Sequence, residues 1–236
     1  MSRHFALVPA AGLGARFGGN TPKQYLPVHG RPLLWHAVAV LARHPRIERV
    51  FVVLHPKDEH FARQPWGGLG KIEGLRVGGD TRADSVRNGL RAMANAADED
   101  WVLVHDAVRP CLTTPMLDRL LSEVGEDDAG GLLAVPLADT LKRADAQARV
   151  LATEPREGRW RAQTPQMFRH GVLLAALSAA REATDEASAV EAMGFKPKLV
   201  MGSDLNLKVT WPDDLLLAEM VLRAVQPASS PPANDV

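Results

Sequence analysis

The sequence predicts an α/β protein with one mostly parallel, twisted sheet and helices on both of its faces. Short runs rich in valine and leucine alternate along the chain with segments of helical periodicity. Strands that are apolar along their whole length, rather than at every second residue, are typical of a sheet buried on both faces. With 236 residues, 46% of them hydrophobic, the chain is long enough for one large domain with a full core.

Six strands and six helices are expected. The strands are predicted at Phe5–Val8, Val50–Leu54, Leu75–Val77, Trp101–Val104, Gly131–Val135 and Lys198–Val200. The helices are predicted at Pro32–Arg43, Arg82–Asn95, Pro115–Val124, Arg169–Arg181, Asp185–Met193 and Pro212–Ala224. Ligands of such sheets bind beyond the carboxyl ends of the strands. Functional side chains are therefore expected in the loops that follow the strands.

Residues 138–160 interrupt this alternation, because they are polar and poor in large apolar side chains. We expect a protruding two-stranded arm with a turn near Asp145–Gln147. An isolated hairpin is marginally stable in water, so the arm is expected to dock on a second copy of the chain. A solvated excursion without function is the alternative. The arm lies within a single predicted domain, residues 1–226, and the Pro- and Ser-rich residues 227–236 are expected to be disordered.

Composition and charge exclude several classes of function. Basic and acidic residues balance at 28 each, so no net charge recruits nucleic acid or an anionic membrane. No apolar run approaches the roughly 18 residues that a membrane-spanning helix needs. The first strand begins too early to leave room for a signal peptide. The single cysteine, Cys111, fits a reducing compartment, and we expect a cytoplasmic protein.

A glycine-rich segment with two nearby cations follows the first predicted strand. It reads Pro9-Ala-Ala-Gly-Leu-Gly-Ala-Arg16, and Lys23 comes soon after. Small residues let backbone N–H groups close around an anion, and the two cations lie where a polyphosphate would lie. A dinucleotide-binding loop would need a glycine in place of Phe17, and a P-loop would need Gly-Lys-Ser/Thr. The segment therefore predicts a nucleoside triphosphate site, although a tight strand-to-helix connection would look similar.

Three further segments bring polar side chains to the same edge of the sheet. Gly78-Gly79-Asp80 precedes a helix that carries Ser85 in its first turn. Asp106 comes directly after a buried strand, and one carboxylate suffices for Mg²⁺, which takes its other ligands from water and substrate phosphates. Lys208 lies in an apolar stretch, where a lysine is costly unless it finds an anion. Arg109 could pair with a carboxylate beneath its loop.

Most of these features also have a plain structural explanation. Gly78-Gly79-Asp80 could be an ordinary capped turn, and Arg82 could belong to a solvated, ion-paired helix face. Lys208 could be an edge-strand lysine that discourages aggregation. Thr184-Asp185-Glu186 is a good helix N-cap with a favourable negative first turn.

Together the motifs resemble the 2-C-methyl-D-erythritol 4-phosphate cytidylyltransferase family, the CTP-using enzymes of the non-mevalonate isoprenoid pathway. The resemblance runs from about residue 5 to residue 222. Two departures are Val108, where alanine is usual, and a compact loop at residues 17–21. The eight matching motifs are Pro9-Ala-Ala-Gly-x-Gly-x-Arg16, Pro22-Lys23-Gln24-Tyr25, Gly78-Gly79-Asp80-x-Arg82-x-Asp84-Ser85-Val86, His105-Asp106-Ala107-x-Arg109-Pro110, Asp139-Thr140, Thr164-Pro165-Gln166, Thr184-Asp185-Glu186-Ala187-Ser188 and Asn206-x-Lys208-Val209-Thr210.

The resemblance implies a Rossmann-like nucleotidyltransferase fold and a set of site residues. Catalytic roles fall to Arg16, Lys23 and Lys208, and Asp106 binds Mg²⁺. The implied nucleotide contacts are Ala10, Ala11, Gly12, Gly79, Asp80, Ser85, Asp106 and Ala107. The implied acceptor contacts are Thr140, Arg156, Thr164, Thr184 and Arg109. The family also implies a homodimer in which the arm of one subunit, with Arg156, reaches the site of its partner.

The implied reaction joins CTP to 2-C-methyl-D-erythritol 4-phosphate, giving 4-diphosphocytidyl-2-C-methyl-D-erythritol and pyrophosphate. A cytidylyltransferase for another polyol phosphate, such as ribitol 5-phosphate, would share Arg16, Lys23 and Asp106. It would differ around Thr140, Arg156 and Thr184. A module that binds CTP as a signal, without catalysis, is the alternative from a different functional class. Such a module would not need cations that stabilise the negative charge of a transition state.

Overall fold

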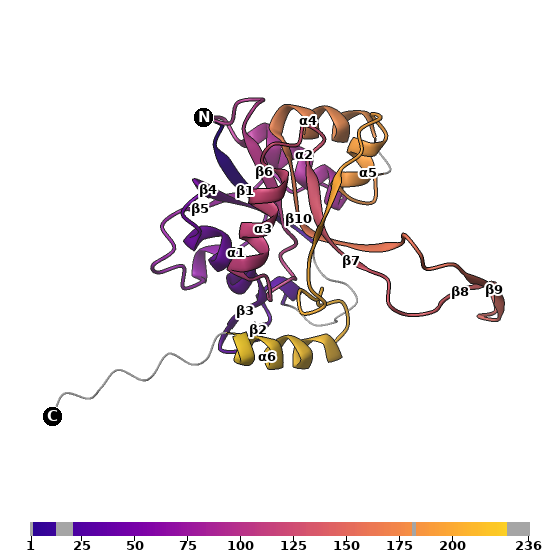
Figure 1. The fold of residues 1–236 in the computed structure, drawn as a ribbon. Helices are drawn as coiled ribbons and strands as arrows, with labels where there is room; N and C mark the ends of the chain where they lie inside the picture. Colours follow the sequence, from indigo (N-terminus) through magenta and orange to yellow (C-terminus); the bar gives the residue numbers. More distant parts are fainter. Residues whose placement is uncertain (1, 13–20, 181–182, 226–236) are drawn as a thin grey trace.

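The structure, a computed structural model, describes residues 2–12, 21–180 and 183–225 (Figure 1). Its centre is a seven-stranded sheet in the order β11-β7-β10-β6-β1-β4-β5. Every neighbouring pair is parallel except the two pairs that β10 makes with β6 and β7. The mostly parallel α/β sheet is therefore confirmed. Its strands are β1 (His4–Ala10), β4 (Arg49–Leu54), β5 (Ile72–Leu75), β6 (Trp101–Val104), β7 (Gly131–Pro136), β10 (Trp160–Arg169) and β11 (Lys198–Met201).

All six expected helices are present, with ends that differ by a few residues from the predicted ones. They are α1 (Leu33–Arg43), α2 (Arg82–Ala92), α3 (Thr114–Val124), α4 (His170–Ala179), α5 (Glu186–Glu191) and α6 (Asp213–Val225). Shorter elements are the 3-10 helices η2 (Lys23–Tyr25) and η3 (Phe61–Arg63) and the paired strands β2 (Pro27–Val28) and β3 (Arg31–Pro32). In the described residues no helix is long and apolar enough to cross a bilayer.

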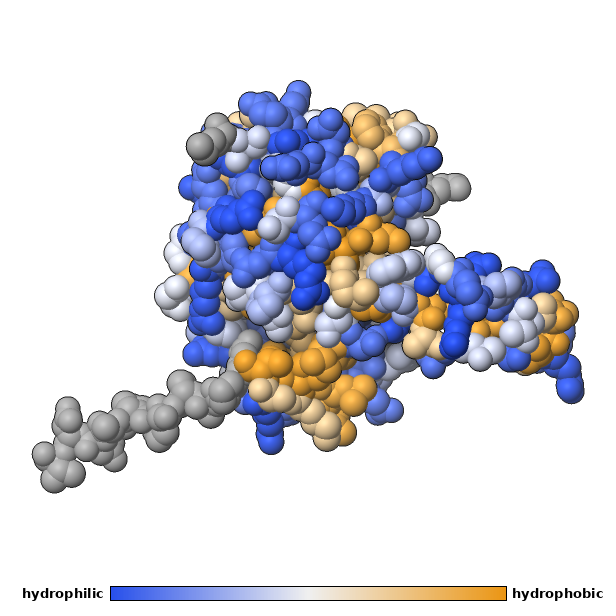
Figure 2. Space-filling view, in the orientation of Figure 1, coloured by the Kyte–Doolittle hydropathy of each residue, from blue (hydrophilic) through white to orange (hydrophobic). Residues whose placement is uncertain are grey.

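A hairpin extends from the main body where the arm was expected (Figure 1). Its strands, β8 (Leu141–Ala144) and β9 (Val150–Glu154), are antiparallel. The turn is closed by the N–H of Asp145, which donates to the carbonyl of Arg149 at 2.9 Å. Val150 and Leu151 on this arm are 63% and 60% exposed. A second apolar surface covers part of α6 (Figure 2), so hydrophobic side chains on both the arm and α6 face solvent.

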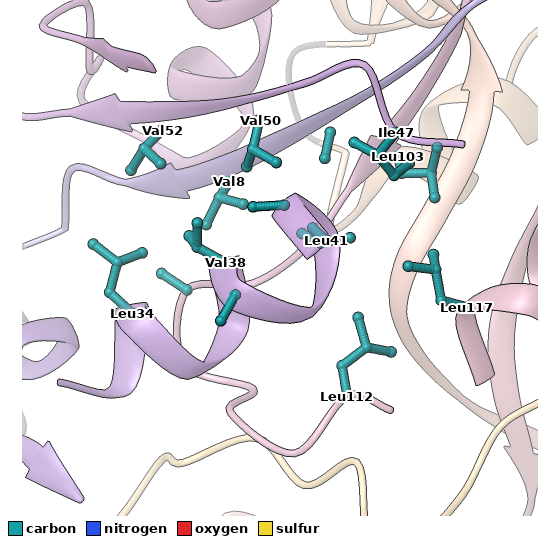
Figure 3. Close-up of a cluster of buried hydrophobic side chains, with 14 of the residues drawn as sticks. Val8, Leu34, Val38, Leu41, Ile47, Val50, Val52, Leu103, Leu112 and Leu117 are labelled. Atoms are coloured by element: carbon teal, nitrogen blue, oxygen red, sulfur yellow. The ribbon is translucent and has the colours of Figure 1, made fainter. Parts of the chain in front are cut away.

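The core lies on both faces of the sheet, as the apolar strands predict. Along β1, Ala6 and Val8 pack toward α1 and α3, whereas Phe5 and Leu7 pack toward α2, α4 and α5. Figure 3 shows the first of these layers, with aliphatic side chains of α1 directed at the valines of β1 and β4. Because successive side chains of a strand point to opposite faces, this division follows from the period of two. The rigid sheet fixes the loops at its edge.

The sequence-based prediction missed β10, which is the longest strand in the described residues and lies in the interior of the sheet, between β7 and β6. Its central residues, Gln163-Thr164-Pro165-Gln166, are polar and include a proline, a pattern that argues against an interior strand. The structure accommodates them at a register irregularity between Ala162 and Gln166. This strand places Thr164 beside the end of β6. The predicted disordered tail, residues 227–236, lies outside the described residues.

Candidate functional site

A cavity of about 600 Å³ lies at the carboxyl ends of β1 and β6. Lys23 and Lys208 line it together with every residue predicted to contact the nucleotide: Ala10, Ala11, Gly12, Gly79, Asp80, Ser85, Asp106 and Ala107. The structure thus brings together residues from five separate segments of the chain. The predicted catalytic residue Arg16 falls in residues 13–20, outside the described part of the chain.

Two glycines allow close packing of the loop before α2, one against the loop after β1 and one against the first turn of α2. A Cβ added at Gly78 would lie 2.3 Å from the Cβ of Ala11, and one at Gly79 would lie 2.5 Å from the Cβ of Asp84. A larger residue at Gly78 would therefore push the loop before α2 away from the loop after β1, and one at Gly79 would push it away from the first turn of α2. The N–H of Gly79 donates to Oγ of Ser85 at 3.1 Å, which fixes the loop on the first turn of the helix.

Lys23 is followed in the chain by two anchored residues. Gln24 donates to the carbonyl of Ala10 at 2.7 Å, and the hydroxyl of Tyr25 donates to Asp58 at 2.8 Å. The ammonium group of Lys23 donates to the carbonyl of Val209 at 2.7 Å, so it points toward the segment that carries Lys208. The backbone that directly follows this cation is thereby fixed before any ligand binds.

Asp106 lies at the floor of the cavity among three cations. Its Oδ1 accepts from Nε of Arg82 at 2.9 Å, while Oδ2 lies 3.0 Å from Nζ of Lys208 and 3.6 Å from Nε of Arg109. Burial alone would raise the pKa of this carboxyl, but Arg82, Lys208 and Arg109 outweigh it and hold the pKa well below its usual range. Asp106 is therefore ionised at neutral pH.

Arg82 lies in the site, although the sequence also allowed it to belong to a solvated, ion-paired helix face. Besides Asp106, its guanidinium binds Glu186, whose side chain is buried, at 2.7 and 3.1 Å. Burial raises the pKa of Glu186, whereas the charge and hydrogen bonds of Arg82 lower it. Both oxygens of Glu186 accept N–H bonds, which is the geometry of an ionised carboxylate. One signal for this was available. A cation in the first turn of a helix is unfavourable for the helix dipole, so Arg82 needed acidic partners.

The residues expected to contact the acceptor are spread more widely. Oγ1 of Thr164 accepts from the N–H of Asp106 at 3.0 Å, and Arg109 donates to the carbonyl of Asn206 at 2.7 Å. Both are buried behind Asp106 rather than lining the cavity. Thr184 lines a smaller cavity of about 240 Å³ beside Arg82. Thr140 and Arg156 lie away from both cavities, at the base of the arm.

Comparisons with known proteins identify the family of this chain. The family model described as 2-C-methyl-D-erythritol 4-phosphate cytidylyltransferase matches residues 4–224. A protein of that name from Dechloromonas aromatica is 62% identical over 226 residues, which span 95% of this chain and 99% of the relative. The one from Azoarcus is 57% identical over 222 residues, 93% of this chain and 94% of the relative.

Solved structures match over the same length. The crystal structure of a 4-diphosphocytidyl-2C-methyl-D-erythritol synthase has a TM-score of 0.84 and 40% identity, covering 94% of this chain and 99% of the other. The structure of 2-C-methyl-D-erythritol 4-phosphate cytidylyltransferase from Thermus thermophilus has a TM-score of 0.77 and 34% identity, covering 94% and 100%. Since fold and sequence agree along nearly the whole chain, it belongs to the 2-C-methyl-D-erythritol 4-phosphate cytidylyltransferase family.

Proposed function

We propose that this protein transfers the cytidylyl group of CTP to 2-C-methyl-D-erythritol 4-phosphate, releasing pyrophosphate. The observation that carries the proposal is the convergence of eight predicted nucleotide-binding residues, Lys23 and Lys208 on one cavity at the edge of the sheet. The glycine-rich loops allow the close backbone approach that a flat base and a polyphosphate require. Family membership supplies the choice of nucleotide and acceptor.

In the proposed reaction a phosphate oxygen of the acceptor attacks the α-phosphorus of CTP. A new P–O bond forms as the bond to the β-phosphate breaks, and its electron pair leaves with pyrophosphate. The phosphate monoester is already anionic near neutral pH, so the protein has no nucleophile to activate. Catalysis then consists of positioning and charge stabilisation.

The cations of the site are proposed to meet the charge of the phosphates. Lys23, with Arg16, would hold the triphosphate, and Lys208 would act on the α-phosphate or the attacking phosphate. A cation about 4 Å from a phosphate contributes on the order of 4 kcal/mol before desolvation, at an effective dielectric constant near 20. The anchored backbone around Lys23 supports this assignment, because a fixed charge needs no rearrangement during the reaction.

Asp106 is the proposed protein ligand of Mg²⁺. Its carboxylate is ionised and lines the cavity, which matches the hard oxygen donor that this ion prefers. Among the described residues no cluster of three or more His, Cys, Asp or Glu side chains could hold a metal. A single carboxylate is nevertheless sufficient where substrate phosphates and water complete the shell. When bound, the ion would neutralise phosphate charge beside Lys208.

The active form is proposed to be a cytoplasmic homodimer with exchanged arms. Val150 and Leu151 on the arm and Leu217 and Met220 on α6 are each more than half exposed. Figure 2 shows hydrophobic areas on the arm and over α6. Apolar areas of this kind mark contact surfaces, and a hairpin alone is marginally stable. An exchanged arm would carry Arg156 away from its own chain and toward the acceptor side of the partner's site.

One assay tests the proposed function. The purified protein is incubated with CTP, Mg²⁺ and a panel of C4 and C5 polyol phosphates, and nucleotide products are identified. Formation of the cytidine diphosphate adduct of 2-C-methyl-D-erythritol is expected. Faster turnover of ribitol 5-phosphate would favour the alternative acceptor. Tight CTP binding without turnover of any acceptor would favour a sensing module.

A further inference from the structure

The guanidinium of Arg82 joins two carboxylates that lie far apart in the sequence. Its Nε donates to Oδ1 of Asp106 at 2.9 Å, and its two terminal nitrogens donate to the two oxygens of Glu186 at 2.7 and 3.1 Å. Asp106 follows β6, Arg82 begins α2 and Glu186 begins α5. One side chain therefore ties three segments together at the rim of the site.

Glu186 has no role in the reaction proposed above, although its position is costly. The residue is 0% exposed and does not line the main cavity. Within the described contacts, the hydrogen bonds of its carboxylate all come from Arg82. A buried carboxylate costs more in desolvation than an apolar side chain of the same size would. We therefore assign to Glu186 the role of binding and orienting Arg82.

Holding Arg82 also fixes Asp106. Because Oδ1 of Asp106 is bound by Nε of Arg82, the carboxylate cannot rotate freely, and Oδ2 stays directed toward Lys208 at 3.0 Å. The fork of Glu186 keeps the two terminal nitrogens of Arg82 occupied. These two nitrogens are therefore not available to bind Asp106 or a phosphate.

The ion pair of Arg82 and Glu186 also lies next to Thr184, on the expected acceptor side of the site. Thr184 precedes Glu186 by two residues, and both line the small cavity beside Arg82. The start of α5 is further fixed by Gln166, which donates to Asp185 at 2.9 Å and accepts from the N–H of Ala187 at 2.8 Å. Gln166 thus ties Asp185 and Ala187 to β10, and Arg82 links Glu186 to Asp106. Together these contacts set the position of Thr184 relative to Asp106.

We propose that Glu186 and Arg82 form a positioning pair that fixes the carboxylate of Asp106 relative to Thr184. The pair thereby keeps the nucleotide side of the site, with Asp106, at a fixed position relative to the acceptor side, with Thr184. This inference rests on the proposed function, because Thr184 is an acceptor contact only as the resemblance to the cytidylyltransferase family implies.

The test compares two glutamates of the same helix. Glu186→Gln keeps the shape of the side chain but offers Arg82 one acceptor oxygen instead of two, and Glu191→Gln makes the same change at an exposed position. For folded Glu186→Gln, kcat/KM for the acceptor is expected to fall about 10- to 100-fold, the usual cost of a misplaced reacting group. CTP affinity, measured by calorimetry without acceptor, is expected to change only a few-fold. Glu191→Gln is expected to match wild type.

A second variant covers the case in which Glu186→Gln does not fold. Arg82→Lys keeps the positive charge, but a compact ammonium group cannot span Asp106 and Glu186 as the planar guanidinium does, so kcat/KM for the acceptor should fall in the same way. A purely structural role would lower the melting temperature and leave the kinetics of the folded enzyme unchanged. Folded variants of either kind with wild-type kcat/KM would overturn the proposal.

Failure of the proposed function is distinguishable from failure of this inference. If wild type and Glu191→Gln were both inactive with CTP and the acceptor, the proposed function would be wrong. Crystal structures of wild type and of the folded variant would then decide the inference alone. A displaced Asp106 carboxylate or Thr184 backbone in the variant supports the pair, and unchanged positions contradict it.

Discussion

The ammonium group of Lys208 lies 3.0 Å from Oδ2 of Asp106, although the Lys208 side chain is 46% exposed and that of Asp106 only 8%. The other two cations at this carboxylate, Arg82 and Arg109, are 30% and 11% exposed. Lys208 is therefore the partner that moves most easily from a carboxylate to a phosphate. Substrate binding would exchange one anion for another at this lysine without leaving a buried charge unpaired.

Asp106→Asn is expected to abolish turnover together with its dependence on Mg²⁺. The amide removes the hard oxygen donor and leaves Arg82, Arg109 and Lys208 with one negative charge fewer, so lower stability is also expected. Activity titrated with Mg²⁺ and Mn²⁺ binding in the presence of CTP provide the two measurements. Residual turnover that still responds to magnesium would place the metal elsewhere.

Lys23→Ala is expected to lower kcat about 10²- to 10³-fold, as the removal of one charge-stabilising donor does in other active sites. Folding should change little, because Gln24 and Tyr25 keep their own hydrogen bonds to Ala10 and Asp58. Lys198→Ala is the matched control. Its ammonium group also donates to a backbone carbonyl, that of Glu123, but far from the cavity.

Steady-state kinetics and thermal unfolding of both lysine variants check this expectation. A Lys23→Ala enzyme that turns over within a few-fold of wild type would refute the assigned role. Equal losses in the two variants would point to a general effect of removing a lysine rather than to the phosphate site.

Replacing residues 141–154 by a short glycine–serine link is expected to give monomers with weak acceptor binding. The deletion removes the exposed Val150 and Leu151 and leaves the main sheet intact. Analytical ultracentrifugation measures the association state, and KM for the acceptor measures the loss of Arg156 from the partner's site. A dimer of unaltered strength would disprove arm exchange.

The nucleotide side of the site could be predicted because its signals are local. Glycines and small residues after β1, Gly79 before α2 and Asp106 after β6 each follow a strand or precede a helix that the apolar pattern identifies. Parallel strands bring such loops to one edge. All eight residues expected to contact the nucleotide do lie around one cavity.

The parts that could not be predicted depend on pairings between distant segments. Thr164 and Gln166 are polar residues of a buried strand, and they are tolerated because Asp106 donates to one and the other donates to Asp185. The sequence predicts a helix N-cap at residues 184–186, and the structure confirms it: Asp185 is the N-cap and forms a capping box with Ser188. The neighbouring Glu186 gave no local sign of Arg82, since 104 residues separate them.

His105 makes stability depend on pH below neutrality. It is fully buried between Thr164 and the carbonyl of Arg109, at 3.0 and 3.1 Å. Burial lowers its pKa to about 4, so the folded protein keeps the ring neutral. The unfolded chain, with an ordinary pKa near 6.5, takes up a proton as the pH falls below that value. Stability is therefore complete above about pH 6.5 and declines toward pH 4.

The decline attributable to His105 is on the order of 3 kcal/mol at pH 4, from a shift of about 2.5 pH units. The free energy of unfolding measured in urea at several values between pH 4 and pH 7 checks it. His105→Gln does not titrate, so its curve should be flatter, although its stability at pH 7 should be lower than that of wild type. Some slope should remain, since burial also lowers the pKa of His4 to about 4. Parallel curves for the two proteins would show that protonation of His105 does not limit acid stability.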